Sequence, residues 1–300
     1  MSATITAPSE AAAMHIDDIK TVGVVGCGTM GSGIVQVIAD AGYNVVVREV
    51  TQEYCEAGRN RIDRFLSGAV AKGKKTQEDK DALMGRLAFV TELAELIDCD
   101  LVVEAMIENL QLKNEMWAQL DQICKPGAIF ATNTSSLSVT EQAASTKRPS
   151  QFVGMHFFNP VPLMKLVEIV RGLQTSDATM ETGLEFGRRI GKEVVACKDT
   201  PGFVVNLLLV PYLNDAARAY EAGVASAEDI DKAMRYGAGY PMGPLRLLDE
   251  IGLDVACYVG EILYDAFKDV KYSAPPILYR MVKAGYLGRK SGRGFYEYGQ

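Results

Sequence analysis

Short apolar runs alternate with amphipathic segments over the first two thirds of the chain. Each run is too brief for a helix, whereas the segments between them repeat their apolar residues every three or four positions, as helices do. The expected strands lie at 21–25, 45–47, 87–90, 100–104, 128–132, 151–158, 166–170 and 193–197. The expected helices lie at 29–41, 51–75, 109–124 and 176–190, with a further short helix opened by a capping box of Thr76 and Asp79. This alternation predicts an α/β fold with a Rossmann-type doubly wound sheet.

From about residue 200 the pattern is helical throughout. The expected helices lie at 203–220, 226–236, 244–267 with a break near Gly252, and 276–284. Thr200 is a good N-cap and Pro201 a good first helical residue. The stretch 203–210 is apolar apart from Asn206, so that helix is expected to be buried on most sides, and a ligand could satisfy the amide. The sequence therefore predicts a smaller all-α domain over 200–300.

Composition narrows the class of protein. With 48% hydrophobic and 23% charged residues the chain is typical of a soluble globular protein, and no apolar run approaches the roughly 20 residues of a membrane helix. A net charge of -7 argues against nucleic acid as a partner. The six cysteines lack metal-like spacing, which indicates reduced thiols, no metal site and a cytoplasmic location. Residues 1–19 hold no Lys or Arg and are expected to be a disordered leader before a domain over 20–199.

A glycine turn follows the first expected strand. The order strand, GCGTMG, helix is the context that a dinucleotide-binding turn requires. Gly26 permits the tight turn, Gly28 lets the backbone approach a pyrophosphate, and Gly31 lets the helix lie close to the strand. Thr29 and Met30 begin the helix, whose free N–H groups would hold the phosphates. The turn predicts NAD as the cofactor.

Two charged features follow this turn. Glu49 ends the second strand, where an acid accepts hydrogen bonds from the adenosine ribose; a solvated strand end is the alternative. Arg48 would face away from Glu49, because successive strand side chains point to opposite faces, so NAD is expected over NADP. Residues 59–75 hold six basic side chains against Asp63 alone. They form either a solvated helix face or a surface for a phosphate-rich ligand.

One imidazole is available for chemistry. The chain has 2 histidines, and His15 sits in the polar leader, so His156 is the candidate base. A packed, hydrogen-bonded histidine beside two phenylalanines is the alternative. Ser135 and Asn206 carry groups that could hold a substrate oxygen, and a carboxylate such as Glu168 could orient the ring.

At this point the chain resembles the 3-hydroxyacyl-CoA dehydrogenase family in its short form. The matching stretches cover nearly the whole chain from residue 20: GVVGCGTMGSGI, VVEAMIENLQLKNE, ATNTSSLSVT, GMHFFNPVPLMKLVEIV, CKDTPGFVVNLLLVPYLNDAARAYEAG, EDIDKAMRYGAGYPMGPLRLLDEIGLD and GRKSGRGFYEY. HFFNPVP together with DTPGF is a far more specific signature than the glycine turn. Cys27, commonly alanine, and Leu207, commonly arginine, depart from the family's pattern.

The resemblance implies roles for individual residues. His156 matches the catalytic histidine and Glu168 its carboxylate partner. The residues that it places around the substrate are Ser135, Asn159, Asn206 and, on the CoA nucleotide, Lys72. The residues that it places around NAD are Glu49, where the family usually has aspartate, with Glu108, Lys113 and Asn133.

The implied reaction is NAD-dependent oxidation of a (3S)-3-hydroxyacyl-CoA, such as 3-hydroxybutyryl-CoA, to the 3-oxoacyl-CoA, or the reverse. The resemblance also implies a homodimer through the C-terminal domain. One alternative is a related dehydrogenase of sugar acids or small hydroxy acids, which HFFNPVP disfavours. The other is a catalytically silent, crystallin-like NAD-binding relative, which the intact set of polar residues disfavours.

Overall fold

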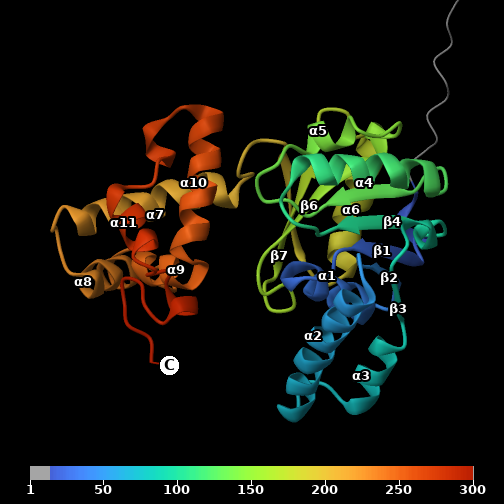
Figure 1. Ribbon diagram of the computed structural model, residues 1–300, viewed down its shortest axis with the longest axis horizontal. Helices are drawn as coiled ribbons and strands as arrows, with labels where there is room; N and C mark the ends of the chain where they lie inside the picture. The colour runs from blue at the N-terminus through green and yellow to red at the C-terminus, as the bar shows by residue number, and fades with distance from the viewer. Residues whose placement is uncertain (1–13, 300) are drawn as a thin grey trace, which may run out of the picture. The chain divides into compact units, whose positions relative to one another are not determined.

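The computed structural model describes residues 14–299 (Figure 1). The chain divides into two compact units between Asp199 and Thr200, the point at which the sequence pattern changes from alternating strands and helices to helices alone. Each unit is described by itself. None of the helices within 14–299 is long and apolar enough to cross a membrane.

One mostly parallel sheet forms the centre of the first unit. Its strand order is β3-β2-β1-β4-β5-β6-β7-β8, and only the β6–β7 pairing is antiparallel. The strands are β1 (Thr21–Val25), β2 (Asn44–Arg48), β3 (Leu87–Val90), β4 (Leu101–Glu104), β5 (Ile129–Thr132), β6 (Phe152–Phe157), β7 (Leu166–Arg171) and β8 (Glu193–Lys198). The predicted Rossmann-type α/β fold is confirmed, with each expected strand present.

Helices cover both faces of this sheet. They are α1 (Thr29–Asp40), α2 (Gln52–Ala71), α3 (Gln77–Met84), α4 (Leu110–Ile123), α5 (Val139–Ala143) and α6 (Asp177–Arg189), with short 3₁₀ turns at η1 (Ile16–Asp18), η2 (Leu93–Leu96) and η3 (Pro149–Gln151). The capping box of Thr76 and Asp79 is present at the start of α3. The short α5 is an addition to the predicted helices, because five residues carry too little periodicity to detect.

Alternating residues of each strand point to opposite faces of the sheet and pack in two layers. Ile34 of α1 and Phe186 of α6 belong to one buried cluster together with Ile129 of β5. The next residue along β5, Phe130, points to the other face, where its ring lies 5.0 Å from that of Trp117 on α4. The sheet is thus buried on both sides, as a parallel sheet requires.

Residues 14–19 correct the prediction of a disordered leader. Ile16 and Ile19 are 6% and 2% exposed and join the main core, because two isoleucines in a polar segment gain by burial. The Met14 amide donates to the Gly127 carbonyl at 3.1 Å. The leader prediction is therefore wrong for 14–19, and its remaining part, 1–13, lies outside the described residues.

The second unit is helical, as predicted. It contains α7 (Val205–Glu221), α8 (Ala227–Lys232), a π-helical turn η4 (Ala233–Gly237), α9 (Pro244–Ile251), α10 (Leu253–Phe267), η5 (Val270–Tyr272), α11 (Pro276–Lys283) and η6 (Arg289–Ser291). Leu248 and Leu278 lie in its core. The predicted break near Gly252 separates α9 from α10, and Gly252 takes a φ of 99°, which a residue with a side chain rarely adopts.

The start of α7 differs from the prediction. Thr200 and Pro201 do not cap the helix, since Gly202 and Phe203 take φ values of 79° and 49° and the helix begins at Val205. This left-handed turn buries the Phe203 side chain, which is 3% exposed. The apolar stretch 203–210 was expected to be buried on most sides. This is also wrong for the single chain, because Leu208 is 68% exposed.

Asp100 joins the beginnings of β4 and β1. One carboxylate oxygen accepts the amides of Lys20 and Thr21 at 2.7 and 2.8 Å, and the other lies 2.5 Å from the Lys125 ammonium. Burial alone would raise the pKa of this carboxyl, but the Lys125 ammonium and the two amides outweigh burial and hold the pKa below its ordinary value of 3.8.

Asp100→Asn should lower the stability of the protein by about 1–3 kcal/mol at neutral pH, because a charged acceptor of three donors is lost. Since the folded-state pKa is lowered, the stabilisation exists above pH 3.8 and disappears as pH falls through the folded value. Thermal unfolding of both proteins from pH 7 to pH 3 measures this. The difference between the two Tm values should narrow as pH falls below 3.8, and a constant difference would contradict the prediction.

Candidate active site

The carboxyl ends of five parallel strands meet at one edge of the sheet. Strands β2, β1, β4, β5 and β6 are neighbours in that order and are all parallel. Ligands of open α/β sheets bind outside such carboxyl ends, at the point where the strand order reverses. Here the edge carries the glycine turn, Glu49, the 105–109 loop, the 133–138 turn and His156.

The glycine turn fits a dinucleotide. Gly26 takes a φ of 94°, and a Cβ on Gly31 would lie 2.0 Å from the Gly26 carbonyl oxygen, so both positions require glycine. Gly28 has nothing within 4 Å of its Cβ position, which leaves the approach to the backbone open. Gly28 caps α1 without a side-chain hydrogen bond, so the amides at the start of α1, including Thr29 and Met30, face this opening.

Glu49 and Arg48 point to different partners at the end of β2. The Glu49 carboxylate accepts the amide of Cys27, in the glycine turn, at 2.5 Å. Arg48 donates from Nε to the Thr91 carbonyl at 3.0 Å, beyond the end of β3. The acid therefore faces the predicted nucleotide site, while the guanidinium is engaged on the other side of the strand.

His156 and Glu168 form a buried pair. They are direct partners across the antiparallel strands β6 and β7, and His156 Nδ1 lies 2.7 Å from Glu168 Oε2. The side chains are 8% and 0% exposed. A carboxylate can only accept a hydrogen bond, so Nδ1 carries the proton and Nε2 is the basic nitrogen of the ring. The Phe158 ring, 4.5 Å away, limits the positions that the imidazole can take.

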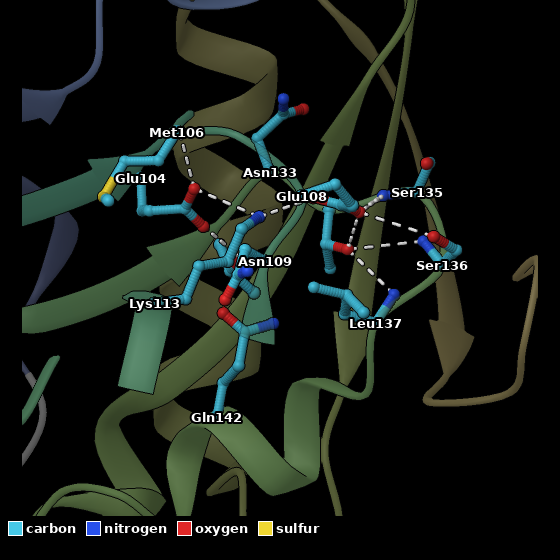
Figure 2. A network of polar contacts seen from close by, with 12 residues as sticks. Glu104, Met106, Glu108, Asn109, Lys113, Asn133, Ser135, Ser136, Leu137 and Gln142 are labelled. Carbon is cyan, nitrogen blue, oxygen red and sulfur yellow. Dashed lines mark hydrogen bonds and ion pairs between the residues drawn. The ribbon is translucent and has the colours of Figure 1, made fainter. Parts of the chain in front are cut away.

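A buried lysine lies between two carboxylates at the carboxyl edge of the sheet. Lys113, in the first turn of α4, is fully buried, and its ammonium lies 3.1 Å from Glu104 Oε1 and 2.6 Å from Glu108 Oε2 (Figure 2). Glu104 is also fully buried; it accepts the Met106 amide at 2.6 Å and the Thr132 hydroxyl at 2.7 Å. Each ion thus has an opposite charge beside it, and both carboxylates accept further hydrogen bonds, as buried ions require.

Glu108 holds the turn that follows β5. Its second oxygen accepts hydrogen bonds from the Thr134 hydroxyl and from the Ser135 amide, the latter at 3.1 Å. Thr134 in turn accepts the Leu137 amide at 2.9 Å. Figure 2 shows the turn bonded to the Glu108 carboxylate on one side while Lys113 approaches it from the other.

Two further contacts fix the ends of the turn. The Asn133 side chain accepts the Phe157 amide at 2.9 Å, which ties the turn to the residue that follows His156. The Asp199 carboxylate accepts the Ser138 hydroxyl at 2.8 Å and the Thr140 amide at 2.7 Å, at the start of α5. The turn is therefore anchored at its beginning, middle and end.

The first unit brings together most of the residues that the sequence singled out. Those gathered at the carboxyl edge are Gly26, Gly28, Thr29, Met30, Gly31, Glu49, Glu108, Lys113, Asn133, Ser135, His156 and Glu168. Asn159 is exposed in the loop between β6 and β7, and Lys72 is the exposed C-cap of α2. Asn206 lies in the first turn of α7, in the second unit. Sequence reasoning missed Glu104 and Asp199; a charge that ends the apolar run of β4 was the available signal for Glu104.

Part of the basic stretch 59–75 is engaged within the unit, and because α2 ends at Ala71 the expected helix 51–75 was too long at its C-terminal end. Arg61 donates to the Cys27 carbonyl at 2.8 Å, Arg59 lies over the Phe89 ring at 5.0 Å, and Lys75 pairs with Asp40 at 2.5 Å. Burial raises the pKa of the Cys27 thiol to about 12, so this departure from the family's pattern is an unreactive filler of the turn.

These features define a class of protein. A Rossmann-type sheet whose carboxyl edge carries a dinucleotide turn and a buried imidazole–carboxylate pair is typical of NAD-dependent dehydrogenases. The family model described as the NAD binding domain of 3-hydroxyacyl-CoA dehydrogenase matches residues 21–200, and the model of the C-terminal domain matches residues 202–298. The chain belongs to the 3-hydroxyacyl-CoA dehydrogenase family, and it is an oxidoreductase that uses NAD.

Relatives match over nearly the whole chain. The 3-hydroxybutyryl-CoA dehydrogenase of Mycobacterium tuberculosis strain CDC 1551 is 50% identical over 284 residues, which cover 94% of this chain and 99% of the relative. The probable 3-hydroxybutyryl-CoA dehydrogenase of Deinococcus radiodurans is 49% identical over 276 residues, covering 92% and 99%. The crystal structure of (S)-3-hydroxybutyryl-CoA dehydrogenase PaaH1 from Ralstonia eutropha is similar with a TM-score of 0.91 and 44% identity, covering 94% and 100%.

The geometry at the end of β2 predicts the choice of cofactor. Wild-type enzyme should prefer NADH to NADPH, because a 2′-phosphate at Glu49 would meet a negative charge. Glu49→Ala should lower kcat/KM for NADH by about 10–100-fold, the cost of a hydrogen bond to a charged group, and relieve the repulsion of NADPH. Both cofactors are assayed with acetoacetyl-CoA.

Arg48→Ala is the matched control for this prediction, since the Arg48 guanidinium is engaged with Thr91. It should leave the ratio of the two kcat/KM values nearly unchanged. A wild-type enzyme that prefers NADPH would show that Arg48, rather than Glu49, addresses the ribose.

Proposed function

We propose that this enzyme interconverts short-chain (3S)-3-hydroxyacyl-CoA, with 3-hydroxybutyryl-CoA as the representative substrate, and 3-oxoacyl-CoA. The observation that carries the mechanism is the 2.7 Å contact between His156 and Glu168 at the carboxyl edge of the sheet. The short acyl chain is supported by relatives that are named 3-hydroxybutyryl-CoA dehydrogenases and are 44–50% identical.

In the oxidation, His156 Nε2 takes the proton of the 3-hydroxyl group. Glu168 holds the ring through Nδ1 and stabilises the imidazolium that forms, as a carboxylate does in a serine-protease triad. Bound NAD supplies the acceptor for the hydride that leaves C3. In the reverse direction the imidazolium returns the proton to the 3-oxo oxygen.

Polar residues of the 133–138 turn complete the proposed site, and further residues are assigned to it from the family's motif. Ser135 holds the reacting oxygen of the substrate, and Asn206 is assigned to the same oxygen because it matches the family's motif position. Asn159 is assigned to the substrate on the same ground. We assign Glu108, held by Lys113, and Asn133 to the nicotinamide half of the cofactor, and the glycine turn and Glu49 to its adenosine half.

We also propose that the protein is a homodimer located in the cytoplasm. We assign a homodimer to the second unit, because its helices expose large apolar side chains: Leu208 is 68%, Tyr258 48% and Phe267 40% exposed. All six cysteines are free thiols, which suits a reducing compartment, and we propose the cytoplasm.

His156→Ala should lower kcat for acetoacetyl-CoA reduction by roughly 10²–10⁴-fold, because the proton donor and acceptor is removed. The dissociation constant of NADH, measured by fluorescence, should change little. Glu168→Gln should lower kcat strongly as well, since the imidazolium loses its counter-charge. The decrease in NADH absorbance measures turnover.

His15→Ala is the control for this substitution, because His15 is the other histidine and its side chain is 69% exposed. Its kcat should equal that of the wild type. An active His156→Ala enzyme would rule out the proposed base.

Lys72→Glu tests whether the basic stretch 59–75, at the C-terminal end of α2, binds the CoA nucleotide. The KM for acetoacetyl-CoA should rise more than the KM for an acetoacetyl-pantetheine thioester, which lacks the nucleotide. The effect should shrink with added salt, because Lys72 is exposed and its charge is screened.

Lys147→Glu is the matched control, with the same change of charge on an exposed lysine just before β6, at the amino edge of the sheet. It should leave both KM values near those of the wild type. Equal effects of Lys72→Glu on the two substrates would identify the helix as a solvated face.

A further inference from the structure

Glu104 is the one member of the buried charge network that has no role in the proposed reaction. Its carboxylate is fully buried at the end of β4, and both oxygens are in use. Oε1 accepts the Met106 amide and pairs with Lys113, and Oε2 accepts the Thr132 hydroxyl (Figure 2). Glu104 thus connects its own strand, the first turn of α4 and the end of β5.

The Lys113 ammonium depends on Glu104 for its position. Lys113 is fully buried, and among the described residues its ammonium forms ion pairs with Glu104 and Glu108. Glu108 is 23% exposed and is therefore the less confined of the two carboxylates. Burial raises the pKa of the Glu104 carboxyl, and the Lys113 ammonium opposes that rise, so each ion keeps the other in the buried position.

The chain of contacts continues to the turn. One oxygen of Glu108 faces Lys113 at 2.6 Å, and the other accepts the Thr134 hydroxyl and the Ser135 amide. The direction of the Glu108 carboxylate is therefore set on one side by the ammonium and transmitted on the other side to the backbone of Ser135.

We propose that Glu104 is a positioning residue of the reaction: it fixes the Lys113 ammonium, which orients Glu108, which holds Ser135 at the substrate oxygen. This inference rests on the role of Ser135 in the proposed function. A shift of the serine by a fraction of an ångström impairs the reaction, because misplacement of about 1 Å can cost about 10²-fold in rate.

The test separates positioning from folding with a double variant. Glu104→Gln alone leaves Lys113 with one charge partner, so both Tm and kcat should fall. In Glu104→Gln/Lys113→Met both buried charges are removed, so Tm should recover toward the wild-type value. The kcat should stay about 10–100-fold low, because Glu108 still lacks the ammonium that orients it. The NADH dissociation constant should change less than kcat.

Asp121→Asn is the matched control. Asp121 lies in the last turn of α4, the helix whose first turn carries Lys113, and pairs with Arg148 at 2.7 Å with both side chains largely buried. The substitution removes a buried charge at the amino edge of the sheet. Its Tm should fall while kcat stays at the wild-type value.

Thr134→Val tests the last contact of the chain without touching Glu104 or Lys113. The change keeps the shape of the side chain and removes the hydroxyl, which donates to Glu108 and accepts the Leu137 amide. It should reduce kcat as the double variant does. This variant decides the question even if the double variant fails to fold.

Two results would overturn the positioning role: recovery of kcat together with Tm in the double variant, or wild-type kcat in Thr134→Val. Ser135→Ala distinguishes this failure from a failure of the proposed function. If Ser135→Ala is slow but the double variant is active, the role of Ser135 stands and only the positioning role of Glu104 is ruled out. A fully active Ser135→Ala enzyme removes the role of Ser135, and with it the positioning inference.

Discussion

A buried positive charge constrains the whole carboxyl edge of the sheet. An unpaired ammonium at the position of Lys113 would cost several kcal/mol of desolvation, so the chain must deliver carboxylates to it. One comes from the end of β4 and the other from the loop that leads into α4. The path of that loop and the approach of the 133–138 turn both follow from this requirement, because the same carboxylates bind them.

The direction of β7 has an equally specific effect. A parallel sheet alone would place polar residues at strand ends, one after another, without setting two side chains directly opposite each other. The antiparallel pairing of β6 and β7 makes His156 and Glu168 cross-strand partners on the same face. The base and its carboxylate are therefore held by strand register, while the groups that bind the substrate and the cofactor are held by turns.

Much of this arrangement could be predicted from the sequence, for identifiable reasons. Short apolar runs located every strand, and the scarcity of histidine left His156 as the only candidate base. Glu104 escaped notice because a charge after an apolar run looks the same whether it is solvated or buried. The left-handed turn at Phe203 could not be foreseen, since it accompanies burial of that ring, which depends on tertiary packing and leaves no local pattern in the sequence. The order of residues 14–19 was missed because the polar residues around Ile16 and Ile19 made the segment look solvated.

In the hairpin of β6 and β7, the strands that carry the acid–base pair and the loop between them can evolve separately. His156 and Glu168 are fixed by the ladder between the strands, whereas the loop that joins the strands is held apart from them, through the Lys192 ammonium at 2.5 Å from the Val161 carbonyl and 2.7 Å from that of Met164. Substitutions at the exposed Leu163 can therefore accumulate without disturbing the acid–base pair. A lineage could adapt this loop to a new substrate while inheriting the same proton-transfer chemistry.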